Sequence, residues 1–331
     1  MIAYTILYAT AVGLPTLLAA VHASSALRSQ GKAERGVWLA ALGLALALAF
    51  IPLVGSGEEA LSAPVPAVET GLTGLPSVVS VPAVPDFTVP LARAPRLGLD
   101  QLLIGMWLLS SLILTVRWAV AVRRLARATW SCPSETVDGV RVAITATLGP
   151  AVTGVLRPRI LALRWLMSMP QHQRSLVLAH EEEHVRAHDP WLIVASRVAR
   201  ILAPWNPLVW VLSSRLLRAV ELDCDRRVLR RHPDIEAYGL TLLTVASRDP
   251  SGVLGAAAFA GSEAPLRHRI LVMTTPPRNA SIAGIFAALF LGALLIVGAF
   301  EMPIPIFRSQ GGSGPVNVPD LVAGGTIGGV V

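Results

Sequence analysis

Cysteine, aromatic and charged residues are all scarce in this sequence. Its 331 residues include only two cysteines, Cys132 and Cys224, so no disulfide framework is implied. Charged residues make up 15% of the chain and hydrophobic residues 53%, with a mean hydropathy of +0.60. A chain this apolar is not typical of an ordinary soluble protein. The composition therefore favours a protein embedded in a membrane.

Long apolar runs predict membrane-spanning helices. Two of the runs carry no charge over about 20 residues, the length that crosses the hydrocarbon layer. Another contains Pro15, which a membrane helix tolerates, and another contains Arg117, which can snorkel near a helix end. The four predicted spans are roughly Ile2–His22, Val37–Gly55, Leu102–Val122 and Ser281–Phe300.

A signal peptide is the alternative for the first run. Val21, His22 and Ala23 loosely resemble a cleavage site of small residues. No Lys or Arg precedes the run, however, whereas a signal peptide has a basic start. We therefore expect the first run to remain as a span.

Basic residues predict the orientation in the membrane. The loop after the first run and the segment after the third run are basic, whereas the loop between the second and third runs is more acidic. The positive-inside rule then puts the N-terminus outside and the segment from 123 to 280 in the cytoplasm. The basic residues are Arg28, Lys32 and Arg35 in the loop and Arg123, Arg124 and Arg127 in the segment.

The net charge of +7 has two interpretations. Nucleic-acid binding is not expected, because the arginines lack the aromatic interleaving or the motif of such a module. Attraction to anionic membrane lipids explains the charge instead. The predicted organisation is two spans within 1–55, an extracytoplasmic Pro/Val-rich linker at 56–99, a span at 100–122, a cytoplasmic domain at 123–280, a span at 281–300 and an extracytoplasmic tail at 301–331.

The sequence HEEEH at 180–184 is the strongest candidate for a functional site. His180 and His184 lie four apart on a predicted helix, so both imidazoles can reach one zinc ion at about 2.0–2.1 Å. Glu181 can then take a proton from a zinc-bound water. Glu182 and Glu183 are expected to be solvated. This pattern predicts a zinc-dependent hydrolase.

A hydrolytic zinc site needs a third protein ligand. Asp189 is expected to cap its helix or orient a neighbour, and His188 is excluded because eight helical residues rise about 12 Å from His180. Glu221 and Asp225 lie four apart on another predicted helix and share a face. We assign Glu221 as the metal ligand and Asp225 as an acceptor for the second nitrogen of a ligand histidine. A solvated charge pair is the alternative.

Short strands are predicted just before this helix, within Val140–Pro150 and Val155–Trp165. Their edge can hold an extended peptide near the metal, or the strands can simply cover the helix. After Pro190, an apolar run broken by arginines predicts helices that lie against the membrane or form the domain core. A further helix is predicted over Ala237–Ser247.

The motifs HEEEHVRAHDP, PWNPLVW and ELDCD, in this order, resemble the M56 family of membrane metallopeptidases, the BlaR/MecR antirepressor group. GPAVTGVLRPRI and APLRHRI are also similar to that family, and the similarity covers roughly residues 123–300. The resemblance implies one zinc ion per chain, bound by His180, His184 and Glu221, with Glu181 as the general base. It also implies an α+β peptidase domain of the gluzincin type in a bacterial plasma (inner) membrane.

In function, the resemblance implies a signalling protease that cuts cytoplasmic proteins, often a transcriptional repressor and sometimes itself. The antibiotic-sensing members carry a penicillin-binding domain after the last span, whereas about thirty residues follow it here. The S-x-x-K formed by Ser29 and Lys32 lies in a short loop, so the sequence does not support β-lactam sensing.

We therefore expect a multi-pass α-helical membrane protein with four transmembrane helices and a cytoplasmic peptidase domain. Three alternatives remain. An M48-type quality-control protease uses the same zinc chemistry, and an intramembrane protease would bury the HEEEH motif inside a span. The third alternative is a non-catalytic receptor or scaffold with a structural zinc, which needs no general base.

Overall fold

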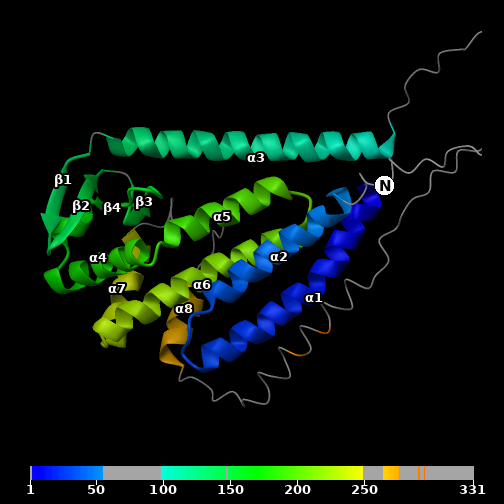
Figure 1. Ribbon diagram of the computed structural model, residues 1–331. Helices are drawn as coiled ribbons and strands as arrows, with labels where there is room; N and C mark the ends of the chain where they lie inside the picture. Colours follow the sequence, from blue (N-terminus) through cyan, green and yellow to red (C-terminus); the bar gives the residue numbers. More distant parts are fainter. Residues whose placement is uncertain are drawn as a thin grey trace, which may run out of the picture.

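The structure, a computed structural model, describes residues 2–54, 98–130, 132–146, 148–248 and 264–275, together with Phe290 and Leu294. These residues form a mostly helical molecule with one small sheet near one end (Figure 1). The elements are α1 (Ile2–Ser29), α2 (Arg35–Val54), α3 (Leu99–Trp130), β1 (Ser134–Val137), β2 (Val140–Thr145), β3 (Ala151–Thr153), β4 (Arg159–Leu163), a 3-10 turn (Arg164–Ser168), α4 (Gln171–Arg186), α5 (Asp189–Leu202), α6 (Pro207–Arg231), α7 (Ile235–Arg248) and α8 (Ala264–Thr274).

The first two helices pack against α5 and α6 around an apolar core that includes Trp38, Leu212 and Leu216. Helix α1 ends because Gly31 adopts a left-handed conformation, with φ of 67°. The N–H groups of Gly31 and Lys32 then donate to carbonyls of the last helical turn, as in a Schellman motif. The short loop that follows leads directly into α2.

Helix α2 is capped from α6. The carboxylate of Asp223 accepts hydrogen bonds from the backbone N–H groups of Glu34 and Arg35, at 3.1–3.2 Å. Arg226 donates to both Asp223 and the Glu34 carboxylate. This buried network fixes the start of α2 against the helix that carries Glu221.

Helix α3 confirms the third predicted run as helical and extends it in both directions, through the basic residues after 122. Within the described residues it is the helix that is long and apolar enough to cross a membrane, and its apolar window is not buried. It contacts the end of α5, where the Trp107 indole and the Ser111 hydroxyl donate to the carbonyls of Leu202 and Ile201. These donors satisfy carbonyl groups that a helix end leaves free.

The other predicted spans stay predictions. The first and second runs form α1 and α2, and α1 continues unbroken through the region weighed as a cleavage site. The fourth run lies outside the described residues apart from Phe290 and Leu294. Most of the linker at 56–99 and all of the tail at 301–331 also lie outside them.

The sheet has the order β1-β2-β4-β3, with β2 and β4 parallel and both outer pairs antiparallel. Asp138 and Gly139, both with positive φ, form the two-residue hairpin turn between β1 and β2. The two predicted strand regions are confirmed as β2 and β4, whereas β1 and β3 were not expected. One face of the sheet packs its apolar side chains against Val177 and Leu178 of α4.

Helix α4 therefore lies between the sheet and α6 (Figure 1). The predicted helices after Pro190 are confirmed as α5 and α6, which help form the core, and the predicted helix near 237–247 is α7. Helix α8 packs against α6 and α7. This arrangement brings four helices, α4, α6, α7 and α8, to one polar cluster.

Candidate metal centre

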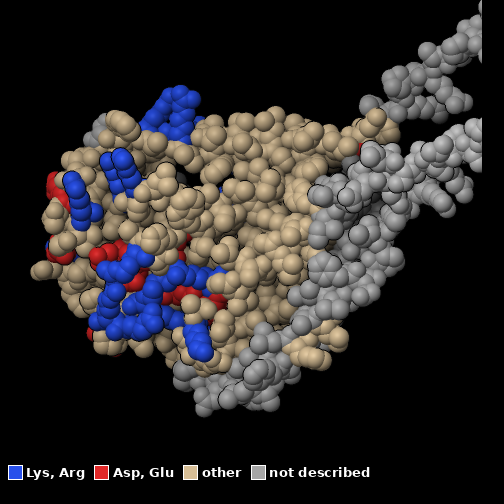
Figure 2. All heavy atoms as spheres, viewed as in Figure 1, with Lys and Arg blue, Asp and Glu red and all other residues tan. Residues whose placement is uncertain are grey.

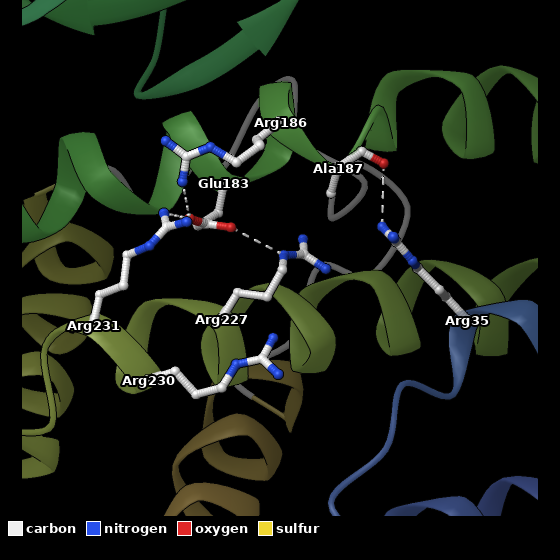
Figure 3. A pocket seen from close by; sticks show the side chains of 7 residues that line it. All are labelled: Arg35, Glu183, Arg186, Ala187, Arg227, Arg230 and Arg231. Carbon is white, nitrogen blue, oxygen red and sulfur yellow. Dashed lines mark hydrogen bonds and ion pairs between the residues drawn. The ribbon is translucent and has the colours of Figure 1, made fainter.

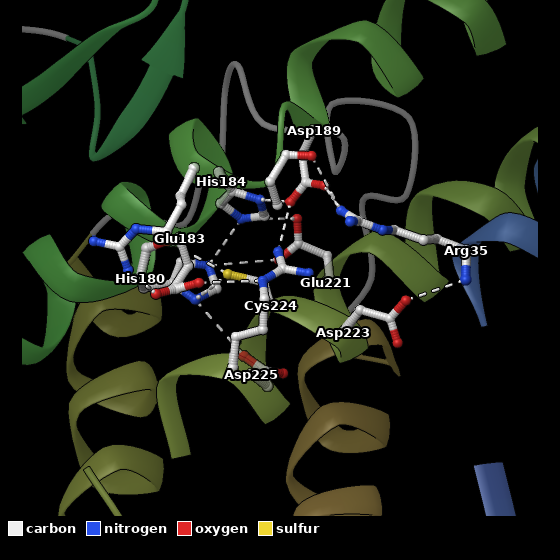
Figure 4. A network of polar contacts seen from close by, with 12 residues as sticks. Arg35, His180, Glu183, His184, Asp189, Glu221, Asp223, Cys224 and Asp225 are labelled. Atoms are coloured by element: carbon white, nitrogen blue, oxygen red, sulfur yellow. Dashed lines mark hydrogen bonds and ion pairs between the residues drawn. The ribbon is translucent and has the colours of Figure 1, made fainter. Parts of the chain in front are cut away.

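His180 and His184 point their Nε2 atoms at one another from successive turns of α4 (Figure 4). The two nitrogen atoms lie 3.2 Å apart, and the rings meet edge to face. Two ligands that each bind a tetrahedral zinc ion at about 2.0–2.1 Å would be separated by about 3.3 Å. The spacing of the two nitrogens therefore fits one shared metal ion.

The Nδ1 atoms of the two histidines are hydrogen-bonded, which shows the tautomer of each ring. His184 Nδ1 lies 2.7 Å from Asp189 Oδ2, to which it donates. His180 Nδ1 lies 2.9 Å from the hydroxyl of Tyr238, whose own hydrogen goes to Asp225 Oδ1 at 2.7 Å. His180 Nδ1 must then be the donor, because a hydroxyl carries only one hydrogen. In both rings the Nε2 lone pair is left for a cation.

Glu221, on α6, supplies a carboxylate to the same point. Its Oε2 atom lies 3.7 Å from His180 Nε2, and its Oε1 atom lies 3.7 Å from His184 Nε2. Burial favours the protonated acid, but the nearby Arg269 guanidinium and the histidines hold the pKa of Glu221 well below its usual value. An ionised oxygen donor thus faces both imidazoles.

Cys224, one turn further along α6, forms a second candidate donor. Its sulfur, His180 and His184 make a group whose ligand atoms lie within 4.8 Å of one another, so a His-His-Cys metal site is compatible with the geometry. Burial alone would raise the pKa of the Cys224 thiol, but the two histidines lower it. The sulfur nevertheless approaches His180 at Nδ1, at 3.3 Å, and also donates to the His180 carbonyl at 3.4 Å.

The negative groups give the site an affinity for cations. Burial by itself would lower the pKa of His180, yet the Cys224 sulfur and the Glu221 carboxylate raise it to about 10. Burial also acts to lower the pKa of His184, but Cys224, Asp189 and Glu221 raise it well above its usual value. A metal ion that binds there replaces protons, because only the neutral imidazole is a ligand.

Glu181 is buried next to the first histidine. Within the described part of the chain it makes no hydrogen bond or ion pair. Burial, together with the Glu221 charge, raises the pKa of Glu181 against the opposing effect of the histidines and Arg269. A carboxylate with a raised pKa and no fixed partner can exchange a proton with a water molecule.

Asp225 lies beside the site, as expected from its spacing, but reaches the histidine indirectly. Its Oδ1 is 3.7 Å from His180 Nδ1, too long for the direct hydrogen bond that the sequence suggested. Tyr238 bridges the two groups, and Arg269 binds both oxygens of Asp225 at 2.6 and 2.8 Å. The carboxylate therefore acts on His180 through Tyr238.

Glu183 was expected to be solvated, and this expectation is wrong. Its side chain is 3% exposed and forms ion pairs with Arg186, Arg227 and Arg231. Position 183 shares the buried face of α4 because it follows His180 by three residues. Glu182 is 44% exposed, as predicted.

Asp189 orients His184, the neighbour-orienting role that the sequence allowed for it. It is fully buried and is also bound by Arg35 and Arg227. His188 is exposed and adopts a left-handed conformation at the turn before α5.

Sequence reasoning missed the contacts of Tyr238, Arg269 and Cys224 with the site. Cys224 lies within the ELDCD motif, and Arg269 lies within APLRHRI, but neither had a role assigned. These two motifs were the signal in the sequence that could have pointed to Cys224 and Arg269. Tyr238 lies 58 positions from His180, and no local pattern marks it.

An HExxH helix crossed by a helix that bears a carboxylate is the donor arrangement of a metal-dependent peptidase. A family model described as BlaR1 peptidase M56 matches residues 33–273, which is more than half of the chain. The chain therefore belongs to this family, and the predicted resemblance to it is confirmed.

A curated relative supports the same assignment. The chain is 28% identical over 155 residues to the regulatory protein BlaR1 of Bacillus licheniformis. The match covers 44% of this chain and 26% of the relative, so the chain spans about a quarter of that protein's length. The family is one of metallopeptidases, which implies a bound metal.

Proposed function

We propose that the chain is a membrane-embedded zinc metalloendopeptidase with a regulatory role. The observation that carries this proposal is the geometry of the two imidazoles. The Nε2 atoms of His180 and His184 lie 3.2 Å apart, and the opposite nitrogen of each ring is hydrogen-bonded. Among the residues that the structure describes, Glu181 has no hydrogen-bond or ion-pair partner. A structural zinc site would need neither the uncommitted acid nor an open position.

Glu221 is the proposed third zinc ligand, in preference to Cys224. Its carboxylate lies on the Nε2 side of both rings, where the ion would be bound. The Cys224 sulfur lies by Nδ1 of His180, on the other side of that ring, and is hydrogen-bonded to a backbone carbonyl. The two histidines and Glu221 would leave a fourth position for water or substrate.

In the proposed reaction, a zinc ion held by His180, His184 and Glu221 would supply Lewis acidity, which polarises a peptide carbonyl and lowers the pKa of water to about 7. Glu181 removes a proton from the attacking water and returns it to the leaving amine. Asp189 and Tyr238 keep the ligand imidazoles in the required tautomer and orientation.

The proposed substrate is an extended segment of a cytoplasmic protein, such as a transcriptional repressor, or a segment of the chain itself. Within the described residues, β3 pairs with β4 alone and packs against α4, so its other edge is available for main-chain hydrogen bonds. The regulatory role is supported by the name of the relative, a regulatory protein.

The proposed topology has four spans, with the peptidase domain on the cytoplasmic side of a bacterial plasma membrane. The basic loop between α1 and α2 and the basic end of α3 support it. In a Cys132→Ser background, Gln30→Cys should react with an impermeant maleimide only after spheroplasts are permeabilised. Gly98→Cys, at the other end of α3, should react in intact spheroplasts. The reverse pattern would refute this orientation.

The enzymatic proposal is tested by comparing wild type, Glu181→Gln and the matched control Glu182→Gln, each loaded with zinc. Loss of the base should reduce peptide cleavage by at least about 10²-fold while zinc content is unchanged. The control should retain activity, because Glu182 is on the exposed side of α4. A wild-type protein that binds zinc but cleaves no peptide would instead support the scaffold alternative.

A further inference from the structure

A basic pocket lies between the ends of α4 and α6, next to the start of α2 (Figure 3). It has a volume of about 360 Å³. Its walls come from the start of α2, the end of α4 and the end of α6. The lining residues are Arg35, Glu183, Arg186, Ala187, Arg227, Arg230 and Arg231.

Positive charge in this pocket exceeds the negative charge that it contacts. Five arginines line it, with Glu183 as the single acidic lining residue. Asp189, behind the wall, pairs with Arg35 and Arg227. Glu182, outside the lining, pairs with Arg186. Three carboxylates thus contact five guanidinium groups, which leaves an excess of two positive charges. Arg230 makes no hydrogen bond or ion pair within the part of the chain that the structure describes.

Such an excess favours binding of an anion. A guanidinium group keeps its charge at any ordinary pH, so the pocket cannot relieve the repulsion by losing protons. The planar N–H forks of arginine match the oxygens of phosphate, and several forks can share one phosphate group. Three of these arginines already converge on one acidic side chain, Glu183, which shows that their forks can reach a common point.

The position of the pocket indicates the source of the anion. Arg35 is the first residue of α2, and the helix is apolar from Val37 onwards. If α2 spans the membrane as proposed, Arg35 lies at the cytoplasmic headgroup level. Figure 2 shows that charged residues gather in the half of this face that holds the sheet and the ends of α4 and α6, while the other half is nearly free of them.

We propose that this pocket binds a phosphate group, presented by the headgroup of an anionic phospholipid. The headgroup as the source rests on the proposed topology, whereas the phosphate site itself rests only on the pocket. Arg35 and Arg227 also bind Asp189, which holds His184. A bound phosphate would therefore contact the same two guanidinium groups, of Arg35 and Arg227, that bind Asp189 behind His184.

The test uses the full chain without metal, so that it is independent of peptidase activity. Arg230→Glu reverses a charge in the pocket, and within the described residues it breaks no ion pair. Arg164→Glu, at an exposed position outside the pocket, is the matched control. The probes are inorganic phosphate, measured by calorimetry in detergent, and nanodiscs of phosphatidylcholine with or without phosphatidylglycerol, measured by lipid retention in native mass spectrometry.

We expect the Arg230→Glu protein to bind both probes at least about 10-fold more weakly than wild type and the control protein. Phosphatidylglycerol retention without measurable binding of free phosphate would also support the headgroup site. Binding of free phosphate with no preference for phosphatidylglycerol would keep the phosphate site but refute the lipid as its source. Equal binding by all three proteins would overturn the proposal.

Discussion

Asp189 Oδ2 lies 2.7 Å from Nδ1 of His184, and the same oxygen accepts a hydrogen bond from Arg227 at 2.9 Å. The other oxygen of Asp189 binds Arg35. One buried carboxylate thus connects the first residue of α2, the start of α5 and the end of α6 to a histidine of α4. The orientation of His184 therefore depends on how these helices pack.

Replacing Asp189 should weaken metal binding. In Asp189→Asn the side chain keeps its size but loses the charge that holds the His184 N–H. We expect zinc affinity to fall by about 10–100-fold, as for other partners behind metal-bound histidines. Competition with a chelator measures this affinity, and His188→Ala, an exposed change one residue away, serves as control. An unchanged affinity in Asp189→Asn would show that this hydrogen bond is not needed.

Tyr238→Phe tests the equivalent support behind His180. The substitution removes the hydroxyl that links His180 to Asp225 but keeps the ring that packs with Leu176 and Val228. Zinc affinity should again fall by about 10–100-fold. The far-ultraviolet circular dichroism spectrum should remain that of wild type. A variant with wild-type affinity would remove Tyr238 from the proposed role.

The two neighbouring acids Glu182 and Glu183 should differ sharply in their effect on stability. Glu183→Ala removes a buried carboxylate that accepts from Arg186 and Arg231 and pairs with Arg227, and should lower the free energy of unfolding by about 1.5–3 kcal/mol. Glu182→Ala removes only an exposed pair with Arg186 and should cost less than about 1 kcal/mol. Chemical unfolding in detergent compares the two variants, and similar losses would contradict the buried network.

Helix periodicity explains what the sequence could predict of the site. His180 and His184 lie one turn apart, and Glu221 and Asp225 lie one turn apart, so both pairs could be placed on helix faces before the fold was known. The prediction that Glu183 is solvated was wrong because this side chain pairs with arginines of α6, more than forty positions away. Burial of this kind depends on which helices meet, which local spacing does not give.

Tyr238 and Arg269 could not be predicted for the same reason. Their side chains reach the site because α7 packs against α4, and α8 packs against α6 and α7. The sheet shows the same limit: its two longer strands, β2 and β4, were predicted, whereas the shorter β1 and β3 gave too little pattern. The helical nature of the first three apolar runs followed from composition, although composition alone does not show which helices cross the membrane.

X-ray absorption spectroscopy of the zinc-loaded protein tests the central claim most directly, because it reports which atoms surround the ion. Zinc held by His180, His184 and Glu221 should show only nitrogen and oxygen neighbours, at about 2.0–2.2 Å. A sulfur neighbour at about 2.3 Å would identify Cys224 as a ligand and contradict this account, and a protein that binds no zinc would contradict it as well.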